Sequence, residues 1–147
     1  MISLSVPGLL LYRDIAVRVV GAAAKLLGPA AGRASSPDLA DDFGSQVVSA
    51  FGEAFNNLAI HGYGGSPSGT IDIEIIGTRD ASGAGEVVIR ITDTGQVFDP
   101  HSHSTPPDAE PERGMGLFII RNFIDDIDYV GGPPNVLTLR KRFSAPE

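Results

Sequence analysis

A glutamate and an asparagine, Glu53 and Asn57, stand four residues apart in a segment whose apolar residues recur at helical spacing. Side chains at positions i and i+4 lie one turn apart on the same face of a helix. A carboxylate can act as a base, and an amide oxygen is a neutral ligand that Mg²⁺ accepts beside phosphate oxygens. If a nucleoside triphosphate lay against this face, Glu53 would orient or deprotonate the nucleophile and Asn57 would hold the metal. Taken alone, such a pair is more often two solvated helix residues.

A second candidate set is Asp93-x-Gly95, directly after an alternating strand pattern. A buried carboxylate can accept a hydrogen bond from the exocyclic amine of adenine, and a neighbouring glycine would let a flat base approach the backbone without meeting a Cβ. Guanine has an acceptor at the corresponding position, so this chemistry favours adenine. By itself the tripeptide is more often a simple turn.

The third set is Gly114-x-Gly116, preceded by Arg113, at the start of an expected helix. Backbone N–H groups at a helix start bind anions, glycine admits phosphate oxygens closely, and an arginine there would contact a phosphate. The preceding segment is rich in Pro, Ser, Asp and Glu without periodicity, which predicts a mobile lid at about 96–113. In this segment His101-x-His103 lacks a third metal ligand at a recognisable spacing, so a solvated pair is favoured.

Hydrophobic periodicity and turn residues predict the elements that position these sets. A first helix, from Leu9 to Leu27, is predicted from apolar residues at helical spacing: Leu11, Ile15, Val19, Ala22, Ala23 and Leu26. The other expected elements are an edge strand Ile2 to Val6, a helix Pro37 to His61, a hairpin of strands Thr70 to Thr78 and Glu86 to Thr92, a helix Arg113 to Asp125, and strands Ile127 to Val130 and Val136 to Phe143.

This order predicts an α+β fold, a two-layer α/β sandwich in which three helices cover one face of a mostly antiparallel five-stranded sheet. The other face of the sheet would meet solvent or a partner. With 147 residues, the chain is expected to form a single domain, 1–147.

The amino-acid composition argues against several classes of function. The chain is 42% hydrophobic and 20% charged, and no apolar run approaches the roughly 20 residues of a membrane span. A net charge of -7 argues against non-specific nucleic-acid binding, which requires basic surface. The absence of cysteine excludes disulfides, thiolate nucleophiles and zinc–cysteine sites. The first residues do not resemble a secretory signal, so a cytoplasmic location is expected.

Taken in order, Glu53-x-x-x-Asn57 with His61-Gly62-Tyr63, then Asp93-x-Gly95, then Arg113-Gly114-Met115-Gly116-Leu117 resemble the N, G1 and G2 boxes of the gyrase, chaperone, histidine-kinase and mismatch-repair ATPase superfamily. The short single-domain form resembles bacterial anti-sigma factor serine kinases. The resemblance spans about Leu39 to Phe143 and implies a Bergerat-type ATP-binding fold. One departure is Asn135-Val136-Leu137-Thr138, where the family often has Gly-Thr before its last strand.

The resemblance implies roles for these residues. Glu53 would be the catalytic base and Asn57 the ligand of Mg²⁺. Asp93 and Gly95 would hold the adenine of ATP. The phosphates would meet Gly114 and Gly116, and the rest of that nucleotide-binding segment is Arg113, Met115 and Leu117.

The implied function is an ATP-dependent serine protein kinase and anti-sigma regulator. It would transfer the γ-phosphate to a serine of an anti-sigma factor antagonist, sequester a partner such as a sigma factor, and form a homodimer. The alternative is a non-catalytic ATP-binding switch that acts only by sequestration. A third possibility, ATP hydrolysis that drives a conformational change, lacks the transducer domain of the larger superfamily members.

Overall fold

The computed structural model of the protein describes residues 1–29, 31, 42–64, 69–97 and 111–147, and of 111–115 the backbone alone. The expected lid at about 96–113 and the pair His101 and His103 therefore lie largely or wholly outside the described residues. The described helices include none that is long and apolar enough to cross a membrane.

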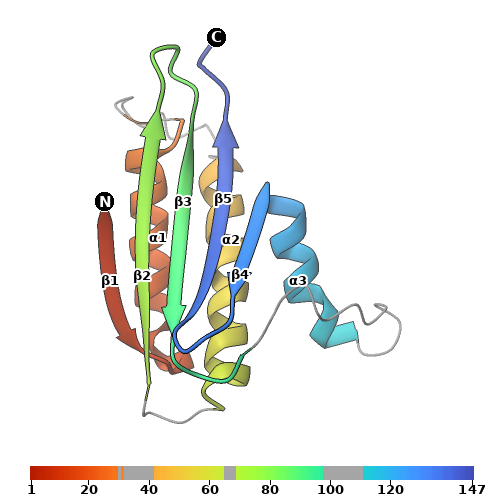
Figure 1. The fold of residues 1–147 in the computed structure, drawn as a ribbon. Coiled ribbons are helices and arrows are strands. Elements are labelled where there is room, and N and C mark those ends of the chain that lie inside the picture. Colours follow the sequence, from red (N-terminus) through yellow and green to blue (C-terminus); the bar gives the residue numbers. More distant parts are fainter. Residues whose placement is uncertain (30, 32–41, 65–68, 98–110) are drawn as a thin grey trace.

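Five strands form one open sheet in the order β1-β2-β3-β5-β4, and every neighbouring pair is antiparallel (Figure 1). The expected edge strand, the expected hairpin and the two C-terminal strands are confirmed. The bounds are β1 Ile2–Pro7, β2 Thr70–Arg79, β3 Gly85–Asp93, β4 Asp126–Val130 and β5 Asn135–Phe143.

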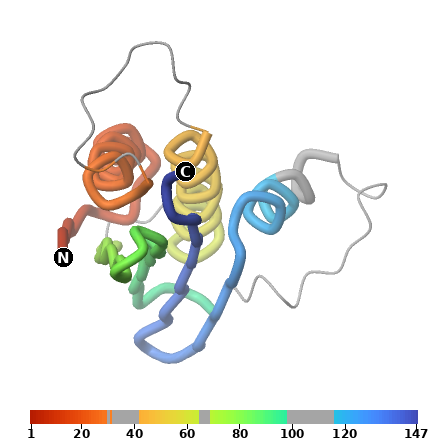
Figure 2. The backbone as a smooth tube through the Cα atoms, turned by 90° about the horizontal axis from the view of Figure 1, so that it is seen from above, coloured from red at the N-terminus to blue at the C-terminus, as the bar shows by residue number. Residues whose placement is uncertain are grey.

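The helices lie side by side on one face of this sheet (Figure 2). A 3₁₀ turn, Leu10–Tyr12, leads into α1, Arg13–Leu27; α2 is Asp42–Asn57 and continues as the π-helical turn η2, Leu58–Gly62; and α3 is Pro111–Phe123. The predicted α+β class, a two-layer sandwich with a five-stranded antiparallel sheet, is therefore confirmed. The start predicted for the second helix, Pro37, falls outside the described residues.

The core lies between the two layers because alternate strand residues point toward the helices. On β2 these are Ile71, Ile73 and Ile75, each at most 1% exposed, and they meet the two large aromatic residues of α2, Phe51 and Phe55. The opposite face of the sheet is polar and carries cross-strand ion pairs, such as Arg90 with Glu74 at 3.1 Å. This pattern fixes the sheet register, since a slip by one residue would bring charges into the core.

Two details differ from the sequence-based expectation. The residues of α1 that pack inward are mostly small, namely Ala16, Val20, Ala23 and Ala24, whereas three of the larger apolar residues that predicted the helix are exposed: Leu11, Ile15 and Leu26. Small side chains let a helix approach its neighbours closely, and this close packing decided which face is buried. The third helix begins at Pro111, two residues before the expected Arg113.

Candidate nucleotide-binding site

Glu53 and Asn57 lie near the C-terminal end of α2, and both are half-buried. Their neighbours Ala54 and Leu58 are buried, so the pair lies at the border of the apolar face, as the spacing predicts. Directly after Asn57 the helix widens into η2, and the Tyr63 N–H donates to the Leu58 carbonyl at 3.1 Å. Single π turns inside helices are frequent at functional sites.

Glu53 faces α3, which packs against α2. A Cβ added at Gly116 would lie only 2.9 Å from Glu53 Oε2. Because residue 116 is a glycine, the two helices can approach each other without a steric clash with the Glu53 carboxylate. The structure thus brings together the first and third candidate sets, which are about sixty residues apart in the chain.

Asp93 is the last residue of β3 and is 2% exposed. Its Oδ1 accepts hydrogen bonds from the Gly95 N–H at 2.9 Å and from Asn135 Nδ2 at 3.0 Å. Among the described residues nothing donates to Oδ2. Because a buried carboxylate is costly unless its oxygens are hydrogen-bonded, Oδ2 is well suited to accept a hydrogen bond from a ligand amine.

Gly95 has a structural role that the sequence did not suggest. A Cβ at this position would lie 2.5 Å from the carbonyl oxygen of Gly62 and 2.7 Å from its carbonyl carbon. The same carbonyl accepts a hydrogen bond from the Gln96 N–H at 2.8 Å. The close approach of η2 to the turn after β3 is thus sufficient to require glycine here, and the contact of Gly95 with adenine stays a prediction.

Tyr63 holds this turn in place, a role that the sequence did not suggest. Its ring lies between two glycines, since a Cβ at Gly8 or Gly69 would lie 2.1 or 2.0 Å from a ring carbon. The hydroxyl donates to the Thr70 carbonyl at 2.5 Å and accepts from the Thr94 N–H at 2.9 Å. Thr94 is the middle residue of Asp93-x-Gly95, so Tyr63 ties this turn to the start of β2.

Asn135 was also missed as a site residue. It is the first residue of β5, 1% exposed, and its register partner across the sheet is Asp93. A polar residue at the buried position of an otherwise alternating strand was the available signal, but the predicted strand began at Val136.

Because α3 begins at Pro111, the third candidate set lies within the helix and not at its first residue. An α-helix leaves only the N–H groups of its first turn without intrahelical partners, and Gly116 lies beyond the first turn that begins at Pro111. A phosphate contact from Arg113, Gly114 or Met115 stays a prediction, since their side chains lie outside the described residues. Leu117 is 8% exposed and belongs to the buried side of the helix.

Among the described residues no group of three or more His, Asp or Glu side chains could hold a metal ion. The role of Asn57 as the ligand of a magnesium ion, together with the phosphates, stays a prediction. Asn57 suits this role because its side chain is half-buried beside Glu53.

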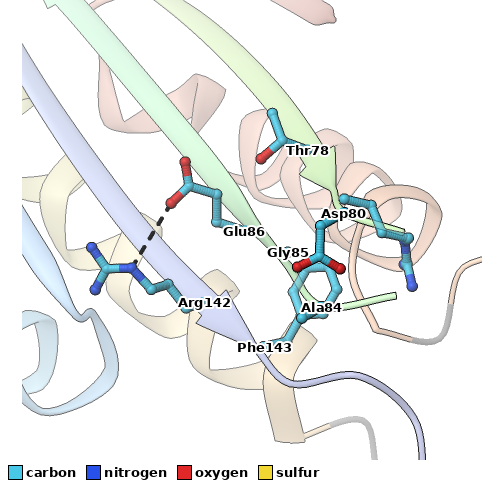
Figure 3. A pocket seen from close by; sticks show the side chains of 8 residues that line it. Thr78, Asp80, Ala84, Gly85, Glu86, Arg142 and Phe143 are labelled. Carbon is cyan, nitrogen blue, oxygen red and sulfur yellow. Dashed lines mark ion pairs between the residues drawn. The ribbon is translucent and has the colours of Figure 1, made fainter. Parts of the chain in front are cut away.

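A hollow of about 460 Å³ lies at the other end of the sheet, around the β2–β3 turn and the end of β5 (Figure 3). Its Glu86 is paired with Arg140 at 2.7 Å and with Arg142 at 4.0 Å. Its Asp80 accepts a hydrogen bond from the Ser82 hydroxyl, which lowers the pKa of Asp80. These charges already have partners, and β3 runs its full length between the hollow and Asp93.

The candidate site is therefore at the end of the molecule where β3 ends and α2 continues into η2, at the bottom of Figure 1. The same fold is found in the histidine kinase domain from Erythrobacter litoralis EL346 blue-light activated histidine kinase, with a TM-score of 0.50 and 15% sequence identity over 92% of this chain and 60% of that one. The fold class is that of histidine-kinase-type ATP-binding domains.

Residues 14–141 match the family described as the histidine kinase-like ATPase domain, and the chain belongs to this family. It is 36% identical over 90 residues to an anti-sigma F factor of Clostridium botulinum (strain Eklund 17B / Type B), which covers 56% of this chain and 58% of that protein. It is 34% identical over 97 residues to an anti-sigma F factor of Heyndrickxia coagulans, which covers 63% and 62%. The chain thus spans about three-fifths of the length of these curated relatives.

Proposed function

We propose that the protein is an ATP-dependent serine protein kinase and anti-sigma regulator, which phosphorylates a serine of an anti-sigma factor antagonist and sequesters a partner such as a sigma factor. The observation that carries this proposal is the approach of Glu53 to Gly116, because it unites the candidate base with the candidate phosphate-binding segment. Membership in an ATPase-domain family and similarity to two anti-sigma F factors support it.

In this proposal Asp93 Oδ2 accepts a hydrogen bond from the adenine amino group, and Asn57 holds Mg²⁺, which offsets charge on the phosphates. A bond forms between the serine Oγ and the γ-phosphorus, the bond from that phosphorus to the bridging oxygen of the β-phosphate breaks, and ADP leaves. Glu53 accepts the proton of the serine hydroxyl. Arg113 would offset negative charge in the transition state.

The experiment that tests the kinase is phosphate transfer from radiolabelled ATP to a candidate antagonist protein, with Glu53→Ala beside the wild type. The variant should bind ATP as the wild type does and transfer phosphate about 10²- to 10⁴-fold more slowly, the usual contribution of a general base. Asp128→Asn, an exposed carboxylate on β4, is the matched control and should transfer phosphate normally. Normal transfer by Glu53→Ala would remove Glu53 from the mechanism.

The alternative is a switch that binds ATP and acts on its partner only by sequestration. The same assay separates the two functions, because a pure binder forms a complex with its partner and leaves no phosphoserine. Its supporting observation is the buried, hydrogen-bonded carboxylate of Asp93, which requires no turnover.

We also propose that the protein forms a homodimer through α1. The face of this helix that points away from the core carries an apolar stripe that begins in the preceding 3₁₀ turn. Leu11 is 81%, Ile15 52% and Leu26 68% exposed, and Ala22 is exposed between them. Exposed apolar side chains on one helix face, here flanking the exposed Arg18, are typical of a protein–protein contact.

The spacing of the stripe suits a second copy of the same chain. Leu11 and Leu26 are equally distant from a point between Arg18 and Val19, and so are Ile15 and Ala22. Two antiparallel copies related by a two-fold axis at that point would place Leu11 against Leu26 and Ile15 against Ala22. Such isologous contact is the commonest form of association between identical chains.

The charges beside the stripe agree with this arrangement. In a two-fold pair of antiparallel helices the same flank of each helix faces its equivalent. Asp14, which is paired with Arg18 at 3.0 Å, and Lys25 lie on one flank, near opposite ends of the helix, and both are exposed. Asp14 of one copy would therefore lie near Lys25 of the other, so unlike charges meet at both ends of the interface.

A further inference from the structure

Asn135 is among the most deeply buried polar side chains in the described residues, and it lies beside the candidate adenine pocket without being aimed into it. Its Nδ2 donates to Asp93 Oδ1 at 3.0 Å and to the Gly95 carbonyl at 3.0 Å. Its Oδ1 accepts from the Gly132 N–H at 2.9 Å. The three contacts join β3, the turn after β3 and the β4–β5 turn.

The orientation of this amide is fixed by its partners. A carboxylate and a carbonyl can only accept hydrogen bonds, whereas the Gly132 N–H can only donate one. A flipped amide would face two acceptors with its oxygen and lose all three bonds. Since a primary amide has two N–H groups and both are engaged, Asn135 has no donor left for a ligand.

The contact with Asp93 leaves the carboxylate only one orientation. With Oδ1 held by Asn135 and by the Gly95 N–H, rotation about the carboxyl bond would break two hydrogen bonds. Oδ2 is then the single oxygen presented to a ligand, and it is an acceptor. A lone acceptor pairs with the amino group of adenine and repels the carbonyl oxygen that hypoxanthine and guanine carry at the same position.

We propose that Asn135 is a positioning residue that sets the base specificity of the nucleotide site by locking the Asp93 carboxylate with Oδ2 toward the base. This inference rests on the proposed nucleotide binding and adds the residue on which discrimination between purine bases depends. It also gives a physical role to the position where the chain departs from the Gly-Thr of the family it resembles.

The test measures the affinity of the full chain for ADP and for IDP by calorimetric titration. The base of IDP has a carbonyl oxygen in place of the amino group at the purine 6-position and carries a hydrogen on N1. In Asn135→Leu the Asp93 carboxylate loses the hydrogen bond that fixes its orientation. The ratio of ADP affinity to IDP affinity should therefore fall by about tenfold, the effect of one hydrogen bond to a charged group. Thr138→Val, on the same strand but its other face, is the control and should keep the wild-type ratio.

Asn135→Asp supplies a second readout that loss of packing would not produce. The two carboxyl groups would lie within hydrogen-bond distance, where they cannot both ionise without strong repulsion. At low pH one shared proton restores the bond to Asp93 Oδ1, so ADP affinity should approach that of the wild type near pH 5.5 and fall by about tenfold or more by pH 8. The titratable neighbours, His61 on η2 and Tyr63 after it, are common to both proteins, so the wild-type profile is the reference.

The outcomes separate this inference from the proposed function. If the wild type binds no ADP, the nucleotide site itself is wrong. If the wild type binds ADP while Asn135→Leu keeps its ADP to IDP ratio and Asn135→Asp shows the wild-type pH profile, Asn135 does not position Asp93. Should both variants fail to fold, Asn135→Thr decides, because its hydroxyl keeps one donor to Asp93 and should preserve the preference for ADP, whereas Asn135→Val should not.

Discussion

At the scale of single residues, the site depends on contacts between backbones as much as on side chains. Gly95 carries no functional group, yet its α-carbon approaches the Gly62 carbonyl so closely that no other residue fits. The hydrogen bond from the Gln96 N–H to the same carbonyl fixes this approach. The glycine in Asp93-x-Gly95 is therefore a structural requirement for holding the carboxylate at the end of β3.

Gly95→Ala should consequently lose both stability and nucleotide binding. The new Cβ would lie 2.5 Å from a backbone oxygen, and backbone cannot turn aside as a flexible side chain can. The expected loss is about 1–3 kcal/mol of unfolding free energy, measured by chemical denaturation, with ADP affinity measured by titration. Gly62→Ala is a matched control, since its Cβ would meet nothing closer than 3.8 Å. Equal tolerance of both substitutions would show that the approach is not needed.

At the scale of secondary-structure elements, η2 connects the helix that carries Glu53 and Asn57 to the turn that carries Asp93. The widening of the helix brings Gly62 against Gly95 and directs Tyr63 to the Thr94 N–H. Because η2 begins one residue after Asn57, the positions of Glu53 and Asn57 and that of Asp93 depend on each other.

Tyr63→Phe should weaken this connection while leaving the core intact. The ring would keep its place between Gly8 and Gly69, but the hydrogen bonds to the Thr70 carbonyl and from the Thr94 N–H would be lost. The groups left behind lie near solvent, so we expect a loss of only about 1 kcal/mol in unfolding free energy together with weaker ADP binding. Tyr12→Phe, whose hydroxyl has no hydrogen bond among the described residues, should change neither quantity. Unchanged ADP affinity in Tyr63→Phe would show that the turn at Thr94 keeps its conformation without the Tyr63 hydroxyl.

Some secondary-structure elements of the fold can be predicted from the sequence, and others cannot. The strands and their hairpin were predicted because Ile71, Ile73 and Ile75 alternate with polar residues, a pattern that only a strand buries on one side. The buried face of α1 was not predicted, because helical spacing alone does not distinguish apolar residues that pack in the core from apolar residues on the surface. Asn135 was missed because its role depends on the pairing of β5 with β3, and pairing between distant strands is not visible in either strand alone.

At the scale of the whole molecule, the two ends of the sheet have different properties. One end gathers a buried carboxylate, a half-buried glutamate, the approach of η2 to the turn after β3 and the approach of α3 to α2. The other end has a hollow whose charges are already paired. The polar outer face of the sheet suits solvent, whereas α1 exposes large apolar residues. The helix face, and not the sheet, is thus the surface best suited to a permanent partner.

The proposed homodimer can be tested by reversing its charges. Asp14→Lys would place two lysines together at each end of the interface, and Lys25→Asp two aspartates, so each single variant should dissociate more readily than the wild type. The double variant restores unlike pairs and should dimerise again, an outcome that no general loss of stability would produce. Ile15→Lys, at the centre of the apolar stripe, should be monomeric, and Asp128→Lys on exposed β4 should behave as the wild type. Sedimentation velocity over a range of protein concentrations measures the wild type and all five variants. A monomeric wild type, or a double variant no better associated than the single ones, would exclude this interface.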